Sequence, residues 1–262
     1  MKVMILCGGQ GTRLREHTEV RPKPMVEIGG RPILWHIMKL YAHHGFTEFI
    51  LCLGYKGNLI KEYFLNYEAM NSDFTVSLGQ KDATRYHGSR HGEKGWTVTL
   101  VNTGEDAMTG ARVKRAVSYL GKHPETFAVT YGDGVSDIDL KAVLAFHRRH
   151  GRMATVTGVR PPSRFGELTH RGDTVVRFSE KTQVGEGVIS GGFFFFEPAF
   201  LRYLDEDSGC VLERAPLERC VAEGQLKLYE HGGYWQCMDT YRDWESLERQ
   251  WQSGKAPWNV WS

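Results

Sequence analysis

A glycine-rich turn with a cationic side chain follows the first apolar segment of the chain. The residues run Gly8-Gly9-Gln10-Gly11-Thr12-Arg13-Leu14, directly after an expected strand from Val3 to Cys7. Three glycines within four residues remove the Cβ atoms that would keep a ligand away from backbone N–H groups. Such turns bind phosphate, particularly beside the positive end of a helix. Together with the guanidinium of Arg13, the turn indicates a site for a phosphorylated ligand.

A second cationic residue lies on a stiff segment, Arg21-Pro22-Lys23-Pro24-Met25. Proline fixes its own φ near about −65° and favours an extended conformation in the residue before it, so the backbone around Lys23 is restricted. A rigidly aimed ammonium group suits a phosphoryl group better than a freely moving surface lysine does. Lys23 therefore joins Arg13 as a candidate for phosphate chemistry.

Two aspartates are candidates for holding a metal ion. Asp133 follows an expected strand from Phe127 to Tyr131, and open α/β sheets bind ligands outside the carboxyl ends of their strands. Mg²⁺ typically takes one or two carboxylates together with substrate phosphates, which makes Asp239 the expected second ligand. The alternative for Asp239 is to cap a helix expected over Tyr241 to Trp251. The sequence favours neither reading of Asp239.

Weaker candidates accompany later elements. Glu180 and Lys181 end an expected strand, although a surface ion pair explains them equally well and contributes little stability. The segment Gly191-Gly192-Phe193 would let the backbone approach a flat ligand closely. Arg112 opens an expected helix, where it could face a second phosphate.

Two common nucleotide-binding patterns are absent. Gly9 and Gly11 are not followed by the third glycine of the dinucleotide fingerprint, and no acidic residue closes a second strand about 20 residues further on. The P-loop pattern G-x-x-x-x-G-K-[ST] does not occur either. These absences disfavour nicotinamide chemistry and ordinary NTPase chemistry.

Alternating strands and helices must position the candidates in the first half of the chain. The expected strands are Val3 to Cys7, Phe49 to Leu53, Trp96 to Val101 and Phe127 to Tyr131, and the expected helices are Ile33 to His44, Leu59 to Tyr67, Arg112 to Leu120 and Leu140 to His150. Their short connections predict a doubly wound, mostly parallel sheet. Asp139 and Gly151 are typical caps for the last of these helices.

The pattern changes after Gly151. Ala154 to Val159, Thr174 to Ser179 and Gly192 to Phe196 are predicted as strands, some of them antiparallel, whereas the polar segment Lys81 to Lys94 is predicted as a long loop. The predicted fold class is α/β: a Rossmann-like mixed, mostly parallel sheet flanked by helices, with a small additional sheet and a C-terminal helical tail.

The C-terminal tail is rich in tryptophan. Of seven tryptophans, five lie in the last 28 residues: Trp235, Trp244, Trp251, Trp258 and Trp261. A helix would place Trp244, Leu247 and Trp251 on one face. Docking of this helix on the core is the favoured interpretation, and a subunit interface is the alternative.

Composition indicates a discrete site on a globular protein. The 262 residues include 33 basic and 31 acidic side chains, a formal net charge of +2, and no basic stripe of the kind that binds nucleic acid. Five scattered cysteines without a Cys-x-x-Cys pair favour a reducing compartment. No apolar run approaches the roughly 18 residues of a membrane span, so we expect a cytoplasmic protein without a membrane partner.

Taken in order, the motifs resemble those of the sugar-1-phosphate nucleotidylyltransferase family, in particular its cytidylyl branch. The shared segments span nearly the whole chain: Gly8 to Leu14, Lys23 to Gly30, Pro32 to His36, Gly54 to Gly57, Tyr131 to Val135, Arg164 to Gly166, Glu180-Lys181, Gly191 to Phe194, Trp235-Gln236, Met238 to Thr240 and Gly254 to Trp258. Two positions depart from the family pattern, since Thr182 and Cys237 stand where prolines are expected.

The resemblance implies an enzyme that transfers a cytidylyl group from CTP to α-D-glucose 1-phosphate with Mg²⁺, giving CDP-glucose and pyrophosphate. It implies a single in-line displacement, for which positive charge and positioning are the main needs. It also implies a homo-oligomer. The alternatives are the same reaction with UTP, dTTP or another sugar 1-phosphate, or a non-catalytic nucleotide-sugar sensor.

The resemblance also implies a role for each candidate residue. The implied catalytic residues are Arg13, Lys23 and Asp133; the implied nucleotide contacts are Leu6, Gly8, Gly9, Gly11, Thr12, Arg13, Lys23, Arg112 and Gly132; the implied sugar-phosphate contacts are Glu180, Lys181, Gly191 and Gly192; and the implied Mg²⁺ ligands are Asp133 and Asp239. We expect one domain over residues 1–262, with a nucleotide-binding half at 1–155 and a sugar-phosphate-binding half with an oligomerisation tail at 156–262.

Overall fold

The computed structural model describes residues 1–14, 18–79, 83–88, 91–161, 167–171, 173–179 and 187–261. Within residues 167–170 and 177–179 only the backbone is described. Among the described residues, no helix combines the length and apolar character that crossing a membrane requires.

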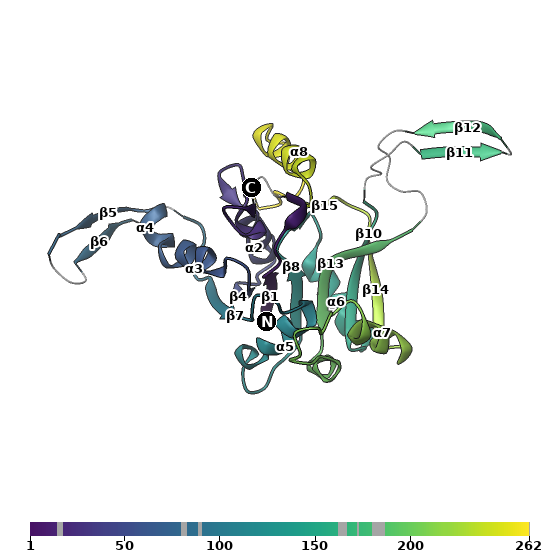
Figure 1. Ribbon diagram of the computed structural model, residues 1–262, viewed down its shortest axis with the longest axis horizontal. Helices are drawn as coiled ribbons and strands as arrows, with labels where there is room; N and C mark the ends of the chain where they lie inside the picture. The colour runs from purple at the N-terminus through teal and green to yellow at the C-terminus, as the bar shows by residue number, and fades with distance from the viewer. Residues whose placement is uncertain are drawn as a thin grey trace.

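A seven-stranded sheet forms the centre of the molecule (Figure 1), in the order β14-β10-β13-β8-β1-β4-β7. Its strands are β1 (Lys2–Cys7), β4 (Glu48–Leu53), β7 (Thr97–Asn102), β8 (Phe127–Tyr131), β10 (Ala154–Val159), β13 (Ile189–Phe196) and β14 (Leu226–His231). Strand β13 runs antiparallel to both of its neighbours, and the other pairs are parallel. The predicted mixed, mostly parallel sheet is therefore confirmed.

Helices cover both faces of this sheet. They are α2 (Ile33–His43), α3 (Gly57–Leu65), α4 (Tyr67–Asn71), α5 (Thr109–Arg115), α6 (Leu140–His150), α7 (Ala215–Ala222) and α8 (Tyr241–Gln252), with short 3-10 turns η1 (Thr12–Leu14), η2 (Lys23–Met25), η3 (Val117–Leu120) and η4 (Pro198–Tyr203). Alternate residues of a strand point to opposite faces. Accordingly Val3 and Ile5 pack in one apolar core with α2 and α6, whereas Met4 and Leu6 pack in a second with α5 and α7.

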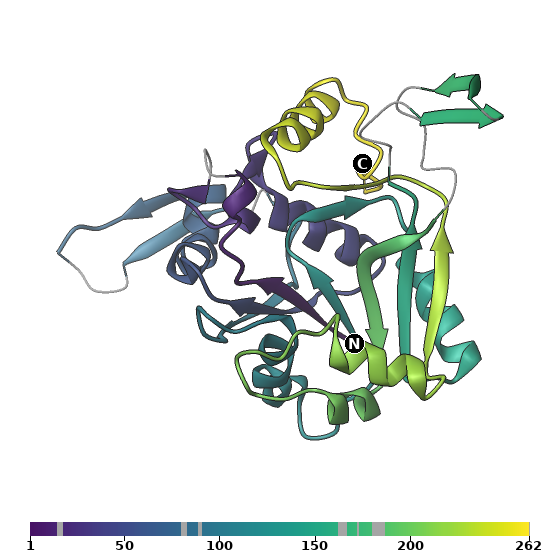
Figure 2. The same ribbon diagram turned by 45° about the vertical axis from the view of Figure 1, so that its right-hand side comes forward.

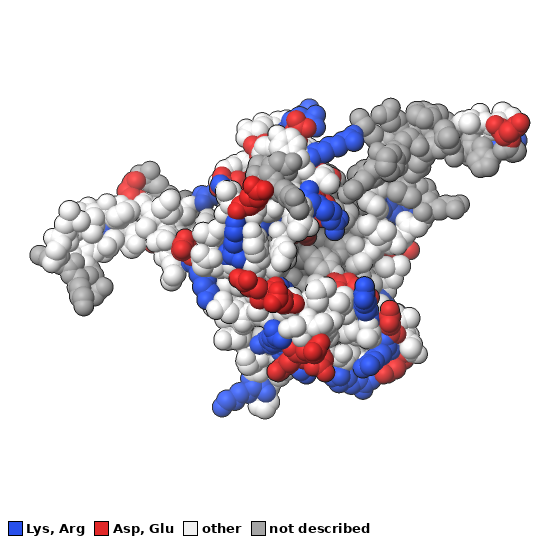
Figure 3. All heavy atoms as spheres, in the orientation of Figure 1, with Lys and Arg blue, Asp and Glu red and all other residues white. Residues whose placement is uncertain are grey.

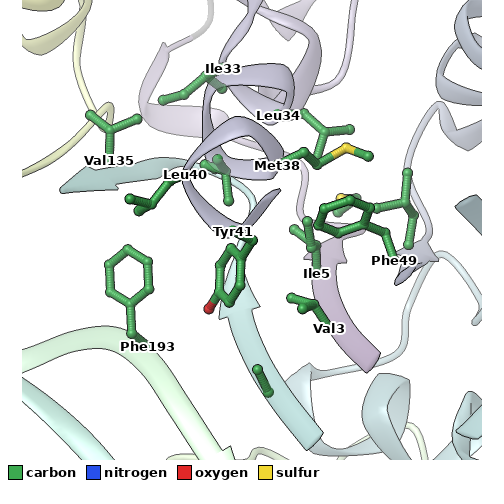
Figure 4. Close-up of a cluster of buried hydrophobic side chains, with 14 of the residues drawn as sticks. Val3, Ile5, Ile33, Leu34, Met38, Leu40, Tyr41, Phe49, Val135 and Phe193 are labelled. Atoms are coloured by element: carbon green, nitrogen blue, oxygen red, sulfur yellow. The ribbon is translucent and has the colours of Figure 1, made fainter. Parts of the chain in front are cut away.

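Helix α2 shows how pattern and packing agree. Its residues Ile33, Ile37, Leu40 and Tyr41 form an apolar face, and all four are buried. Figure 4 shows this face lying over β1, with Tyr41 beside Phe193 of β13. The ring centroids of Tyr41 and Phe193 lie 6.2 Å apart. The helix thus fixes the first strand, and with it the glycine-rich turn that follows.

Four two-stranded ladders accompany the central sheet in the part of the chain that the structure describes. They pair β2 (Glu27–Ile28) with β3 (Arg31–Pro32), β5 (Asp73–Val76) with β6 (Thr84–His87), β9 (Gly134–Ser136) with β15 (Trp235–Cys237), and β11 (Glu167–Arg171) with β12 (Thr174–Ser179). Figures 1 and 2 both show the β5–β6 and β11–β12 hairpins projecting on opposite sides of the body.

Two predicted elements are wrong. The segment Lys81 to Lys94 is not all loop, because Thr84–His87 form strand β6 and pair with β5. The continuous helix expected from Arg112 to Leu120 instead begins at Thr109 as α5, ends at Arg115, and is followed by the 3-10 turn η3.

The C-terminal tail docks on the body, as the favoured interpretation predicted. Leu247 of α8 and Trp258 are almost completely buried in the core that contains α2. The indole Nε1 of Trp244 donates to the Glu27 carbonyl at 2.9 Å, and the ring of Trp251 packs against His36 at 4.6 Å. The aromatic residues thus fasten α8 to its own chain.

Candidate active site

The glycine-rich turn after β1, the start of α5 and the end of β8 enclose a cavity of about 330 Å³. Strands β1 and β8 are parallel neighbours, so the turns at their carboxyl ends open side by side. All eleven residues proposed for the nucleotide and the metal line this cavity: Leu6, Gly8, Gly9, Gly11, Thr12, Arg13, Lys23, Arg112, Gly132, Asp133 and Asp239. Their roles remain predictions, but the fold brings them together.

Lys23 lies between two carboxylates at the floor of the cavity. Its Nζ donates to Asp133 Oδ2 at 2.6 Å and to Asp239 Oδ1 at 2.5 Å. Burial by itself lowers the pKa of Lys23, but the charges and hydrogen bonds of Asp133 and Asp239 outweigh it and hold that pKa above its usual value. Arg13 reaches the other oxygen of Asp239 at 2.8 Å. Two cations and two carboxylates therefore form one connected charge cluster.

The small β9–β15 ladder explains how two distant aspartates meet. It pairs Gly134 with Cys237 in an antiparallel register, and the Met238 N–H donates to the Asp133 carbonyl at 2.8 Å. Asp133 directly precedes β9, and Asp239 lies two residues after the end of β15. Asp239 does not cap α8, because Thr240 is the N-cap and forms a reciprocal capping box with Asp243. The capping alternative for Asp239 is therefore wrong.

The donor set fits a hard divalent cation. The two carboxylates converge on one positive group, the ammonium of Lys23. Within the described residues, no three His, Cys, Asp or Glu side chains gather in a way that could hold a metal by themselves. One or two carboxylates, completed by phosphate oxygens and water, is the ligand set that Mg²⁺ favours.

Arg112, itself a lining residue of the cavity, links three chain segments through its hydrogen bonds. Its NH1 donates to the Leu53 carbonyl (3.1 Å), Thr103 Oγ1 (2.9 Å) and the Gly104 carbonyl (2.7 Å), and its NH2 donates to the carbonyls of Gly8 and Glu105, both at 3.0 Å. A Cβ on Gly8 would lie 2.1 Å from the guanidinium, and one on Gly54 would lie 2.4 Å from it. Glycine is thus required at both positions for this arrangement.

A smaller cavity of about 230 Å³ adjoins the first, sharing Arg13, Tyr131, Asp133 and Asp239 with it. Gly191 lines this second cavity, and its carbonyl accepts a hydrogen bond from Trp235 Nε1 at 2.8 Å. Gly192 is not among the lining residues. Its φ is +78°, and a Cβ there would lie 2.3 Å from the Tyr131 ring. Glu180 and Lys181 lie outside the described residues.

Glu213, which the motifs did not reveal, contacts two residues that line the first cavity. Its carboxylate accepts hydrogen bonds from the Tyr131 hydroxyl and, at 2.6 Å, from Thr109 Oγ1. Burial, reinforced by the charge of Glu213, raises the pKa of Tyr131 well above its usual value. Tyr131 and Thr109 both line the first cavity, so Glu213 joins its two walls. No local pattern around Glu213 could have indicated this contact.

Known proteins resemble this chain in sequence over its full length. Residues 2–240 match the Nucleotidyl transferase family. A glucose-1-phosphate cytidylyltransferase from Salmonella typhimurium is 49% identical over 261 residues, and a probable one from Bacillus subtilis is 43% identical over 269, each match covering 100% of both chains.

Solved structures share the fold at lower sequence identity. HddC from Yersinia pseudotuberculosis has a TM-score of 0.69 at 24% identity, covering 95% of this chain and 99% of its own. A putative glucose-1-phosphate thymidylyltransferase from Bacillus anthracis has a TM-score of 0.68 at 16% identity, covering 100% and 98%.

Proposed function

Because the chain belongs to the nucleotidyl transferase family, we propose that it transfers the cytidylyl group of CTP to glucose 1-phosphate, giving CDP-glucose and pyrophosphate. Full-length relatives that carry the name of this activity support the choice of substrates. The observation that carries the proposal is structural: Lys23, Asp133 and Asp239 meet at one cavity beside the glycine-rich turn.

The proposed step is one displacement at the α-phosphorus of CTP. A phosphate oxygen of glucose 1-phosphate forms a bond to that phosphorus, and the bond to the bridging oxygen breaks as pyrophosphate leaves with its electron pair. The attacking oxygen is already ionised, so no general base is needed. The two anions repel each other, and Arg13 and Lys23 counter this repulsion with fixed positive charge at the place where negative charge gathers.

Mg²⁺ is part of the proposal, with Asp133 and Asp239 as its protein ligands. When bound, the ion supplies positive charge to the phosphate oxygens of the nucleotide. The ammonium of Lys23 between the two carboxylates reduces their mutual repulsion and keeps both aimed at the same point. Lys23 thus holds the two proposed metal ligands, Asp133 and Asp239, in position.

The two adjoining cavities suggest how the substrates divide the site. We assign the larger cavity to the nucleotide and the smaller one, which Gly191 lines, to the glucose 1-phosphate. Glu180 and Lys181 belong to the proposal as sugar-phosphate contacts on the strength of the resemblance alone. The same holds for the single domain with a nucleotide-binding half at 1–155 and a sugar-phosphate-binding half at 156–262.

A pyrophosphate-release assay tests this function directly. Four nucleoside triphosphates are each combined with several sugar 1-phosphates in the presence of Mg²⁺. The proposal predicts the highest kcat/KM for CTP with glucose 1-phosphate. A higher value for another pair would correct the substrates, whereas binding without turnover of any pair would favour a sensor.

A further inference from the structure

The lysine between β4 and α3 has a backbone conformation that residues with a side chain rarely adopt. The φ of Lys56 is +49°, in the left-handed region, and among the described residues Lys56 is the only one other than glycine with a positive φ. Glycine would adopt this conformation without strain, because it has no Cβ. Residues held in such conformations cluster at functional sites. The strain at Lys56 therefore points to a role for its side chain.

The side chain of Lys56 contacts the segment that follows the glycine-rich turn. Its Nζ donates to the Glu19 carbonyl and lies 5.2 Å from the centroid of the Tyr55 ring. The Tyr55 hydroxyl donates to the Thr18 carbonyl at 3.4 Å. Two adjacent residues of the β4–α3 connection thus contact two adjacent carbonyls that lie 37 positions earlier in the chain.

Thr18 connects these contacts to the first cavity. It is only 4% exposed, and its hydroxyl lies 3.1 Å from the Gly11 carbonyl and 3.0 Å from the Leu14 carbonyl. Its methyl carbon would lie 2.9 Å from a Cβ on Gly11, so the two residues are in close contact. Gly11, Thr12 and Arg13 all line the cavity. The position of Thr18 therefore helps to set the position of the backbone that faces the ligand.

The same connection also contacts the start of the glycine-rich turn. The Tyr55 N–H donates to the Gly8 carbonyl at 3.2 Å, and Arg112 donates to that carbonyl as well. Tyr55 and Lys56 together thus contact the chain on both sides of the turn, at Gly8 and at residues 18–19. Neither Tyr55 nor Lys56 lines the cavity, so any effect on a ligand must pass through the turn.

We propose that Lys56 is a positioning residue for the nucleotide: its ammonium group fixes the Glu19 carbonyl and so holds the glycine-rich turn in its ligand-binding conformation. A turn with three glycines has much conformational freedom, and ordering it on binding costs affinity. A turn that is held in advance avoids this cost. The inference rests on the proposed function, because it takes the ligand of the first cavity to be CTP.

Lys56→Asn separates this role from a contribution to stability. Asparagine tolerates the left-handed region and is a favoured N-cap, but its side chain is too short to keep the Glu19 contact. Calorimetric titration with CTP and Mg²⁺ should show an affinity about tenfold weaker than that of wild type, at an unfolding temperature equal to or above that of wild type. A residue that only stabilised the fold would lower both quantities. Lys56→Arg keeps a charged donor and should bind CTP more tightly than Lys56→Asn.

Lys61→Asn is the matched control for the loss of positive charge. Lys61 belongs to α3, which follows Lys56 directly, and it does not line the cavity. Figure 3 shows basic and acidic side chains interspersed over the body of the molecule, so removal of one surface cation should change the surrounding field little. We expect Lys61→Asn to bind CTP as wild type does. An equal loss of affinity in the two asparagine variants would overturn the proposal.

Amide hydrogen exchange of the ligand-free protein tests the contact without any substrate. We expect residues 8–14 to exchange about fivefold faster in Lys56→Asn than in wild type, and at the wild-type rate in Lys61→Asn. Unchanged exchange or unchanged CTP affinity in Lys56→Asn would overturn the proposal. A wild-type protein that binds no CTP would contradict the proposed function itself, and the exchange rates would then decide separately whether Lys56 holds the turn.

Discussion

Lys23 illustrates how much a single side chain does at the site. Two prolines restrict its backbone, two carboxylates accept from its ammonium group, and its side chain is only 12% exposed. A mostly buried cation in this position holds the two carboxylates that we propose as metal ligands, and it faces the cavity in which we place the triphosphate. It therefore carries much of the positive charge that the proposed reaction needs.

A Lys23 variant, compared with a variant of a nearby surface cation, tests whether Lys23 has this role at the site. Lys23→Ala should lower kcat about 10²–10³-fold, by analogy with the loss of one preorganised charge-stabilising donor. Arg21→Ala is the matched control, since Arg21 belongs to the same segment but pairs with Glu27 outside the cavity. Steady-state pyrophosphate release measures both variants. Wild-type turnover in Lys23→Ala would remove this lysine from the mechanism.

The neighbouring glycines Gly8 and Gly9 offer a test of the Arg112 contacts. A Cβ at Gly8 would collide with the guanidinium, whereas a Cβ at Gly9 meets nothing within 4 Å. Overpacking of this kind costs about 1–3 kcal/mol, so Gly8→Ala should lower the free energy of unfolding by that amount and Gly9→Ala should leave it nearly unchanged. Urea unfolding compares them. Equal stabilities would show that Arg112 does not occupy this position in solution.

Among the helices and strands, the ends of an element were predicted best where residues next to it in the sequence cap or terminate it. Helix α6 runs from Leu140 to His150 as expected, because Asp139 caps its first N–H groups and Gly151 ends it with a φ of +62°. The β5–β6 hairpin was missed in part because its strands are short and its apolar side chains Phe74, Val76 and Tyr86 stay largely exposed. An alternation of apolar and polar residues predicts a strand where one of its faces is buried, and little of this hairpin is buried.

Contacts between distant segments escaped prediction for a different reason. Arg112 was recognised as a cation, but four of its five acceptors are backbone carbonyls. Every residue has such a carbonyl, so the sequence does not indicate which ones a side chain will contact. Glu213 contacts Tyr131 across 82 positions of the chain. The motifs around the cavity could be recognised from the sequence because their glycines, prolines and aspartates are typical of particular backbone geometries.

The N-terminus of α8 allows a prediction about an element. Thr240 accepts from the Asp243 N–H and Asp243 accepts from the Thr240 N–H, directly after Asp239. Thr240→Ala should lower the free energy of unfolding by about 1 kcal/mol, the usual cost of losing an N-cap. Ser253→Ala, at the exposed C-terminal end of the same helix, should change it by less than about 0.5 kcal/mol. Urea unfolding distinguishes the two, and equal effects would contradict the capping geometry.

At the scale of the whole molecule, His36 links acid stability to the docking of the tail. Its ring extends from α2 against the tail, with Nε2 2.9 Å from the Ile28 carbonyl and Nδ1 accepting from Trp258 Nε1 at 3.4 Å. Burial lowers the pKa of His36 from 6.5 to about 4. The unfolded chain therefore binds a proton here below pH 6.5, whereas the folded protein does not until the pH approaches 4.

Stability should consequently fall as the pH decreases from about 6.5 towards 4, by up to about 3 kcal/mol from His36. His36→Gln should remove the part of this fall that His36 contributes, and His123→Gln, at an exposed position, should retain it. Urea unfolding at several pH values between 7 and 4 measures the dependence. The same slope in both variants would mean that the tail does not enclose a neutral histidine.

The proposed reaction requires that Asp133 and Asp239, brought together by the β9–β15 ladder, form one metal-binding pair at the cavity that we assign to the nucleotide. The most direct measurement is the rate of pyrophosphate release from CTP and glucose 1-phosphate as a function of Mg²⁺ concentration, for Asp133→Asn, Asp239→Asn and the control Asp106→Asn. Asp106 is exposed and does not line the cavity. We predict that both ligand variants lose at least about 10²-fold in kcat while they keep the wild-type unfolding temperature, and that the control behaves as wild type. Wild-type Mg²⁺ dependence in Asp133→Asn or Asp239→Asn would show that the replaced carboxylate is not a metal ligand.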